Sequence, residues 1–388
     1  MTPTRLRLAA ALACLALAPA PALARPAPIP AAASPDLAAS ALTLGRAVAD
    51  WQLRYLDGRF DYVQTHRPGT QNPRGWIQGA FYVGLAAFAD RTGDARYVEA
   101  IRAHGVQEGW GLGARPLHAD DHVVAQSWIW LYRRDRDPAR IAPVKARFDA
   151  ILAAPPEADL TFIDGTENQP CQARWCWSDA LFMGPPTWTA LSAATGDPRY
   201  AAYADREFWA TTDWLLDKET GLYFRDSRFF DRRDDQGRKI FWSRGNGWVY
   251  AGLVNILKTL PADHPSRPRY VALFQRMSAR LVSLQKSDGY WSVSLLAPEH
   301  SPPESSGTSF FVYGLAWGVN QGLLTAPRYA ASARLGWSAL ARAVRPDGMI
   351  GWVQQVGYAP DHVEADDTQL YGAGAFLLAA SEVSRGRF

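Results

Sequence analysis

The chain has 388 residues, of which 48% are hydrophobic and 16 are tryptophan, so it is long and apolar enough to bury a large core. Its formal net charge of +3 falls to +1 if the first 24 residues are removed, because these contain two arginines and no acidic residue. So small a net charge excludes a general polycationic surface for binding nucleic acid.

The N-terminal residues have the pattern of a secretory signal. Two arginines precede an apolar run that is too short to span a bilayer, and the Ala-Leu-Ala of residues 22–24 is a small-x-small cleavage site. We expect residues 1–24 to be removed as a signal peptide and residues 25–36 to form a flexible Pro/Ala-rich lead-in. Acylation of Cys14 in a lipoprotein is a weaker alternative, because the residues before it fit that motif poorly.

A recurring phrase divides the rest of the chain. The sequence TGDARY at residues 92–97 returns as TGDPRY at residues 195–200, and looser copies begin near residues 137, 266 and 325. Each copy opens a stretch of helical spacing, and Asp or Pro at its front suits a helix N-terminus. These copies therefore predict a set of helices that start in the same way.

Between these copies lie apolar segments rich in glycine and aromatic residues, from GAFYVGLAAFAD at residue 79 to TQLYGAGAFLLAASEV at residue 368. A helix that is apolar on nearly every side is buried on nearly every side, whereas an outer helix keeps a charged face. Inner and outer helices thus alternate with a period of roughly 60 residues. This pattern predicts an all-α fold, an (α/α)6 barrel of six helical hairpins, as one domain over residues 37–388.

Polar residues and glycines gather where each inner helix is expected to begin. They are Trp76 with Gly79, Asp120 with Asp121, Asp179, Arg244 with Asn246, Thr308, and Asp367. In a ring of parallel inner helices these starts meet at one end, where the helix N-termini also favour anions. We therefore expect one cleft with a polar floor and tryptophan walls.

The richest part of this floor is FWSRGNGWVY, residues 241–250. Trp242 and Trp248 offer flat apolar faces on which sugar rings stack, and glycines on both sides of Asn246 allow close approach to a ligand. Arg244 has the geometry to bind a carboxylate through two hydrogen bonds. The alternative is a helix start with structural glycines and core tryptophans.

A single carboxylate, Asp179, stands in the apolar and aromatic run RWCWSDALFMGPP. A buried carboxylate without a partner is costly or takes up a proton, so either a partner lies nearby or a raised pKa is functional. Capping of a buried helix is the structural alternative, both for Asp179 and for the Asp120–Asp121 pair. Just before it, Cys171 and Cys176 could close a small disulfide loop or remain reduced and buried.

Several classes of chemistry lack their motifs in this chain. The seven histidines include no H-x-x-H or H-E-x-x-H spacing, and there is no G-x-S-x-G elbow or phosphate-binding glycine loop. We expect no metal or other cofactor, no acyl transfer and no nucleotide chemistry. No later segment is long and apolar enough to span a membrane, so we expect an exported protein of the periplasm or the medium.

Two phrases together carry a family resemblance. WSDALFMGPP at residues 177–186 and WSRGNGW at residues 242–248 resemble the unsaturated rhamnogalacturonyl hydrolases, glycoside hydrolase family 105, which are relatives of the family 88 unsaturated glucuronyl hydrolases. The resemblance implies an (α/α)6 barrel that removes a 4,5-unsaturated uronic acid from the non-reducing end of a lyase-generated oligosaccharide. Fragments of the pectin rhamnogalacturonan type are the expected substrates.

The resemblance also implies roles for particular residues. The aspartate of the DALFM phrase, Asp179, is the general acid and base, and a second aspartate at the start of the preceding inner helix is Asp121 or Asp120. We take Asp121 as catalytic and Asp120 as a substrate contact. The other expected substrate contacts are Trp242, Arg244, Asn246, Trp248, Trp175 and Trp76. Histidines that hold the sugar in some members have no evident counterpart beside these phrases, which leaves the sugar open.

The implied chemistry explains why an acid would sit in an apolar run. The unsaturated ring is a vinyl ether, so a neutral carboxylic acid can protonate carbon four while water adds to carbon five, and burial keeps such an acid protonated. An inverting glycosidase with an Asp179 and Asp121 acid-base pair is the rival enzyme. An exported uronide-binding protein with tryptophan platforms is the alternative that is not an enzyme.

Overall fold

The computed structural model describes residues 34–56, 72–165, 169–299 and 301–386. The expected signal peptide and most of the expected lead-in lie outside these described residues. Helix α1 begins at Ser34, so residues 34–36 are helical and the expectation of a flexible lead-in up to residue 36 was wrong for them. Proline is well tolerated in the first turn of a helix, which is where Pro35 lies.

Two sets of helices alternate along the described chain, as the repeated phrase predicts. The outer helices are α1 (Ser34–Arg54), α3 (Ala95–Gln107), α5 (Ala142–Ala153), α8 (Pro198–Leu215), α10 (Arg267–Ser283) and α12 (Pro327–Ala343). The inner helices are α2 (Trp76–Thr92), α4 (Ala125–Asp135), α6 (Ala180–Met183) continued by α7 (Pro185–Thr195), α9 (Ser243–Thr259), α11 (Ser305–Asn320) and α13 (Leu370–Val383).

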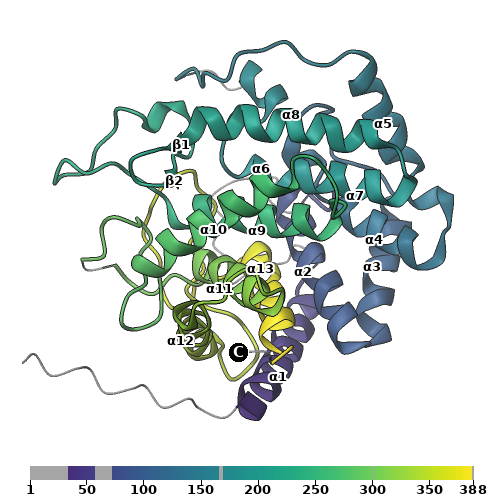
Figure 1. Ribbon diagram of the computed structural model, residues 1–388. Helices are drawn as coiled ribbons and strands as arrows, with labels where there is room; N and C mark the ends of the chain where they lie inside the picture. The colour runs from purple at the N-terminus through teal and green to yellow at the C-terminus, as the bar shows by residue number, and fades with distance from the viewer. Residues whose placement is uncertain (1–33, 57–71, 166–168, 300, 387–388) are drawn as a thin grey trace, which may run out of the picture. The chain divides into compact units, whose positions relative to one another are not determined.

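The inner helices form a closed ring. Each packs against the next in the order α2, α4, α6 with α7, α9, α11 and α13, and α13 packs back against α2 (Figure 1). Glycines let the closing pair approach closely, since a Cβ on Gly84 of α2 would lie 2.1 Å from the carbonyl oxygen of Gly374 on α13. This arrangement confirms the (α/α)6 barrel.

The repeated phrase has two structural roles. Asp94 and Asp197 are N-caps, whose side chains accept hydrogen bonds from the backbone N–H groups of Arg96 and Arg199. The tyrosines that end these two copies then donate hydrogen bonds to carboxylates of the preceding outer helices: Tyr97 donates to Asp50 at 3.0 Å and Tyr200 to Asp149 at 2.7 Å. The phrase therefore starts an outer helix and fastens it to its neighbour.

One inner helix is interrupted at the point that matters for the site. The segment expected as a single helix from residue 179 onward is divided into α6 and α7 at Gly184. Pro185 and Pro186 follow directly, and proline has no N–H to continue the hydrogen-bonding pattern of α6. A Cβ on Gly252 of α9 would lie 2.3 Å from the Leu181 carbonyl oxygen, so α9 packs tightly against this break.

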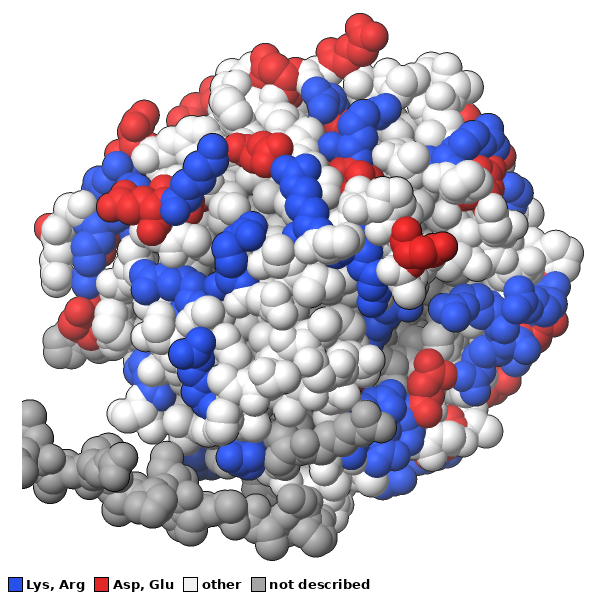
Figure 2. Space-filling view, viewed as in Figure 1, with Lys and Arg blue, Asp and Glu red and all other residues white. Residues whose placement is uncertain are grey.

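The remaining elements are short. A two-stranded antiparallel sheet, β1 (Leu216–Asp217) with β2 (Leu222–Tyr223), lies between α8 and α9. The 3-10 helices are η1 (Ala119–Asp121), η2 (Pro138–Arg140), η3 (Pro170–Arg174) and η4 (Ser227–Phe229). No helix among the described residues has the length and hydropathy needed to cross a bilayer. Acidic and basic side chains are interspersed on the face drawn in Figure 2, with uncharged residues between them.

Candidate active site

The starts of the inner helices meet at one end of the ring, as expected. A Cβ on Gly245, in the first turn of α9, would lie 3.1 Å from the hydroxyl of Ser178, which directly precedes Asp179. A Cβ on Gly307, in the first turn of α11, would lie 3.1 Å from the backbone nitrogen of Arg244. Residues from widely separated parts of the sequence therefore surround Asp179.

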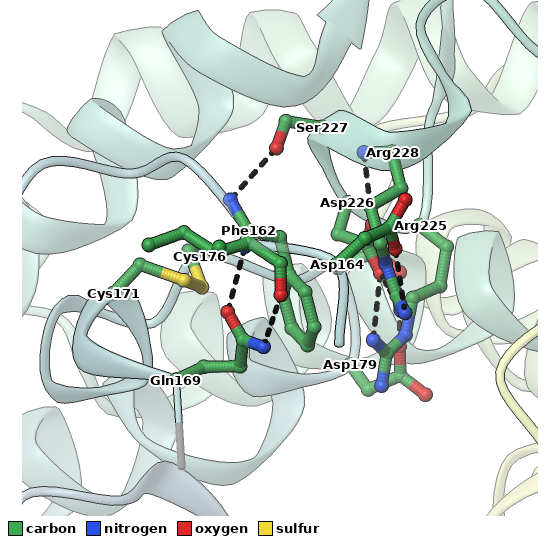
Figure 3. Close-up of polar contacts among 12 residues, drawn as sticks. Phe162, Asp164, Gln169, Cys171, Cys176, Asp179, Arg225, Asp226, Ser227 and Arg228 are labelled. Carbon is green, nitrogen blue, oxygen red and sulfur yellow. Dashed lines mark hydrogen bonds and ion pairs between the residues drawn. A yellow bond between two sulfur atoms is a disulfide. The ribbon is translucent and has the colours of Figure 1, made fainter. Parts of the chain in front are cut away.

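Asp179 has both a partner and a raised pKa. Its side chain is 13% exposed, accepts a hydrogen bond from the Ser178 hydroxyl at 3.0 Å, and lies 3.6 Å from Nε of Arg225 (Figure 3). Burial raises the pKa of Asp179, although the charges of Arg225 and Arg244 and the Ser178 hydrogen bond oppose the rise. The carboxyl group makes no capping hydrogen bond to α6, which removes the helix-cap alternative.

Asp121 is held as an ion by Arg115. One carboxylate oxygen accepts hydrogen bonds from the Arg115 backbone N–H at 2.6 Å and from its Nε at 3.2 Å, and the other accepts from Nη2 at 2.7 Å. Burial alone would raise the pKa of Asp121, but these hydrogen bonds lower it below the usual value. The geometry therefore speaks against Asp121 as the second catalytic acid.

Asp120 has the environment that we expected for Asp121. It lies in η1, with its side chain 18% exposed and Oδ2 3.8 Å from Nδ1 of His118. Burial raises the pKa of Asp120 to about 7; Arg115 opposes this rise, while the negative charge of Asp179 adds to it. Asp120 is thus electrostatically coupled to Asp179, and the geometry favours it as the second acid of the pair.

Arg244 does not present two free donors to a substrate. Its Nη1 donates to the carbonyl oxygen of Gln354 at 2.7 Å, and its Nη2 donates to that of Gln355 at 2.8 Å. The guanidinium lies between the rings of Trp242 and Tyr371, and the residue is 1% exposed. The expectation of a two-bond carboxylate contact is therefore wrong in this structure, because the loop at 354–355 already takes those donors.

Most of the other expected substrate contacts are structural. Asn246 is fully buried and exchanges two hydrogen bonds with the backbone of Tyr223. Trp242 donates to the side chain of Gln354 at 2.7 Å, while Trp248 packs between Phe182 and Phe310. The alternative of a helix start with core tryptophans is correct for this phrase.

Trp175 and Trp76 differ from each other in exposure. Trp175 is completely buried against Trp188 and Tyr203, so it stands behind the site rather than in it. Trp76 is partly exposed and stacks on Tyr371 with ring centroids 5.1 Å apart. Among the six expected contacts from the aromatic phrases, Trp76 is the one that keeps an accessible face.

Known proteins with similar sequences decide the family. Residues 51–386 match the model of the family described as Glycosyl Hydrolase Family 88. The chain belongs to this family. It is 44% identical over 357 residues to the unsaturated 3S-rhamnoglycuronyl hydrolase of Alteromonas sp. (strain LOR), covering 89% of this chain and 86% of that protein.

Two further relatives agree with this family 88 assignment. A protein of the same name from Formosa agariphila is 38% identical over 83% of this chain and 88% of its own length. A solved structure, the glycosyl hydrolase family 88 protein from Bacteroides vulgatus, has a TM-score of 0.77 and 29% identity, covering 90% of this chain and 99% of its own. The resemblance found in the sequence is confirmed, and the chain is a glycoside hydrolase.

In this family 88 enzyme, sequence reasoning missed Arg225 and His118. Arg225 follows β2, and its position beside Asp179 depends on a hydrogen bond from the Ser178 backbone N–H to the Arg225 carbonyl oxygen at 2.8 Å. His118 packs against Trp177 with ring centroids 4.7 Å apart, and burial lowers its pKa to about 3, so it is neutral. The sequence feature that could have pointed to His118 is its position two residues before Asp120.

A cavity of about 280 Å³ lies at the other end of the barrel of this enzyme. Its walls come from the inner helices and include Lys258 of α9 and Glu382 of α13, which form an ion pair at 2.8 Å. Neither Asp120 nor Asp179 lines it. Among the described residues, no group of three His, Cys, Asp or Glu side chains converges as a metal site.

Proposed function

We propose that this hydrolase releases a 4,5-unsaturated uronic acid from the non-reducing end of lyase-generated oligosaccharides by hydrating the vinyl ether double bond. The names of the two curated relatives support an unsaturated uronyl group next to rhamnose. Fragments of the pectin rhamnogalacturonan type are the first substrates to test. The observation that carries the proposal is Asp179, an acid whose side chain is only 13% exposed and whose pKa is raised by burial.

Asp179 would serve both proton transfers. In its neutral form it donates a proton to carbon four of the double bond, and positive charge develops at carbon five, where the ring oxygen stabilises it. The resulting carboxylate then removes a proton from the water that adds to carbon five. The product is a hemiketal, which opens to a ketone and lets the rest of the oligosaccharide leave from carbon one.

Asp120 would keep this acid in its active form. Two carboxyl groups that interact strongly cannot both ionise near neutral pH, so the pair retains one proton where an isolated aspartate would have lost it. Asp120 has a pKa of about 7 through burial and the charge of Asp179. We assign Asp120 rather than Asp121 to this role because Arg115 already neutralises Asp121.

One experiment separates the hydratase from its rivals. The purified protein is incubated in D2O with unsaturated rhamnoglycuronyl disaccharides, and the loss of ultraviolet absorption and the mass of the products are followed. Hydration consumes the conjugated double bond and places deuterium at carbon four. An inverting glycosidase would release the sugar with its double bond intact, and a binding protein would leave the disaccharide whole; either result contradicts the proposal.

We also propose that the protein is exported, with the signal peptide removed after residue 24. The pattern of two arginines, a short apolar run and a small-x-small site supports this. The mass of the protein recovered from the periplasm or medium of its host tests it, since a mature chain should begin at Arg25. An intact N-terminus in the cytoplasmic fraction would contradict export.

A further inference from the structure

We propose that Arg225 binds the carboxylate of the unsaturated uronic acid, and that this contact makes productive binding depend on the negative charge of the substrate. The inference rests on the proposed function and adds a residue that determines specificity. It starts from the place of Arg225 in the fold. The residue lies two positions after the end of β2, and its backbone carbonyl oxygen accepts a hydrogen bond from the backbone N–H of Ser178, so its side chain is held beside Asp179.

The guanidinium of Arg225 has donors to spare. Nη1 donates to Oδ2 of Asp226 at 2.7 Å, but Nε is buried and makes no hydrogen bond within the described residues. Nε lies 3.6 Å from Oδ2 of Asp179, which is too far for a hydrogen bond. A buried donor without an acceptor is costly, so an acceptor that arrives with a ligand would satisfy it.

The neighbouring arginines are less available to a ligand. Arg244 donates both terminal nitrogens to backbone carbonyl oxygens; its Nε also has no partner within the described residues, but the residue is only 1% exposed, which makes it inaccessible. Arg115 donates side-chain hydrogen bonds to Asp121 from both Nε and Nη2. Arg228 donates twice to Asp226 and lies flat on the ring of Phe162 at 4.0 Å. Arg225, with 14% of its side chain exposed, is the cation of this group that is both close to Asp179 and accessible.

The local charge also favours an anion. Asp226 is fully buried and is shared by Arg225 and Arg228, so these three residues carry one net positive charge (Figure 3). Asp179 does not cancel this charge when it is protonated, which is the form that the reaction requires. Asp120 is then the ionised member of the pair and also acts on Arg225, but Arg244 offsets its charge, and Arg115 and Asp121 form a neutral pair, so one net positive charge remains. Asp164 lies 3.7 Å from Arg228, but it is largely exposed and its charge is screened by solvent. The substrate carboxylate, which is attached to carbon five, would neutralise this net positive charge.

This arrangement links binding to proton transfer. In the free enzyme the charge of Arg225 opposes the rise in the pKa of Asp179 that burial causes. A substrate carboxylate bound to Arg225 reduces that opposition, so Asp179 keeps its proton more firmly when the charged substrate is present. A neutral substrate would lack this effect, and the coupling is reciprocal because it is a free energy between two sites.

The test compares two substrates on four proteins. The substrates are an unsaturated uronyl disaccharide and its methyl ester, and the proteins are wild type, Arg225→Gln, Arg225→Lys and Arg228→Gln. We expect wild type to favour the acid over the ester by about tenfold or more in kcat/KM, as a charge-assisted contact would give. Arg225→Gln should raise KM for the acid, abolish this preference, and shift the alkaline limb of the pH profile to higher pH, because Asp179 loses a cation that lowers its pKa.

The other two variants provide the controls. Arg225→Lys keeps the positive charge but lacks the planar guanidinium, so it should retain a reduced preference for the acid over the ester. This variant tests the role of the charge even if Arg225→Gln folds poorly. Arg228→Gln also loses a partner of Asp226 but should keep the acid-to-ester ratio. The inference would be overturned if wild type turned over the acid and the ester equally. It would also be overturned if Arg225→Gln lowered kcat/KM for the acid and for the ester by the same factor. Failure of wild type on both substrates would instead count against the proposed function.

Discussion

Asp179 and Asp120 form a pair whose proposed role in catalysis comes at a cost in stability. Each carboxyl group is largely removed from water, and burial raises the pKa of both. A group whose pKa is higher in the folded state than in the unfolded chain binds its proton more tightly when folded, so its contribution to stability decreases as the pH rises toward the folded pKa. A stability cost of this kind is common where residues are arranged for function.

The variant Asp179→Asn should fold normally and lose activity. Asparagine has nearly the same shape but cannot donate the proton to carbon four, and removal of a general acid typically costs about 10²- to 10⁴-fold in rate. Loss of ultraviolet absorption by the substrate measures kcat, and circular dichroism checks the fold. A variant that keeps a tenth of wild-type turnover would remove Asp179 from the mechanism.

The variants Asp120→Asn and Asp121→Asn should behave oppositely. Without the negative charge of Asp120 the pKa of Asp179 falls, so kcat/KM should decline at lower pH than in wild type, while the melting temperature at pH 8 should rise. Asp121→Asn should instead lower the free energy of unfolding by about 1–3 kcal/mol, because Arg115 loses a charged partner. If Asp121→Asn alone shifted the pH profile, the assignment of the two aspartates would be reversed.

The pH dependence of wild-type activity follows from the same pair. The proton donor must be neutral, and the coupled pair of Asp120 and Asp179 shares a proton until the pH passes the pKa of Asp120, which is about 7. We expect kcat/KM to be high in mildly acidic solution and to fall as the pH rises through the neutral range. A profile that rises steadily up to pH 9 would show that the deprotonated pair is the active form.

The segment from η3 to α6 is the element that fixes Asp179. Cys171 and Cys176 form a disulfide that closes a short loop, in which Trp175 is buried with a positive φ of 61°. The same segment is held from two other sides, by the β2–α9 connection through Arg225 and by the first turn of α9. The loop therefore holds the backbone segment that carries Asp179.

Removal of the disulfide should weaken both the fold and catalysis. A double variant, Cys171→Ala with Cys176→Ala, should lose about 2 kcal/mol of unfolding free energy, as expected for a loop of this length. We expect a lower kcat with little change in KM, since the acid and not the binding contact is displaced. Reducing agent should have this effect on wild type and none on the double variant; an equal response of both would mean that the disulfide does not support the site.

The elements also show what the sequence can and cannot reveal. The apolar run around Asp179 and the repeated caps are local patterns, so the burial of this carboxyl group, the raised pKa and the alternation of helices were predictable. Arg244 was misjudged because its acceptors, the carbonyl oxygens of Gln354 and Gln355, come from a loop more than 100 residues away. The choice between Asp120 and Asp121 depended on the direction of the Arg115 side chain, which no spacing encodes.

The whole molecule depends on one seam, where the first and last inner helices meet. On α13, Gly374 faces the backbone of α2 so closely that a Cβ would lie 2.4 Å from the carbonyl oxygen of Ala80. Every other inner helix has neighbours that are close in sequence order, whereas this contact joins the two ends of the ring. The barrel is closed only when these two backbones are in contact.

The variant Gly374→Ala should therefore destabilise the protein strongly for so small a change. Overpacking of this kind typically costs about 1–3 kcal/mol, and the methyl group here meets backbone that cannot rotate away. Gly357→Ala is the matched control, because a Cβ there has its nearest neighbour at 3.7 Å. Chemical denaturation measures the free energy of unfolding of both variants. Equal values would mean that α2 and α13 can move apart without loss of stability.

This seam sets the order of events during synthesis. Helix α13 follows the other five inner helices in the sequence, and the carbonyl groups that hold Arg244 belong to the loop before it. The growing chain therefore cannot close its ring of inner helices, or complete the contacts of Arg244, until α13 has been synthesised.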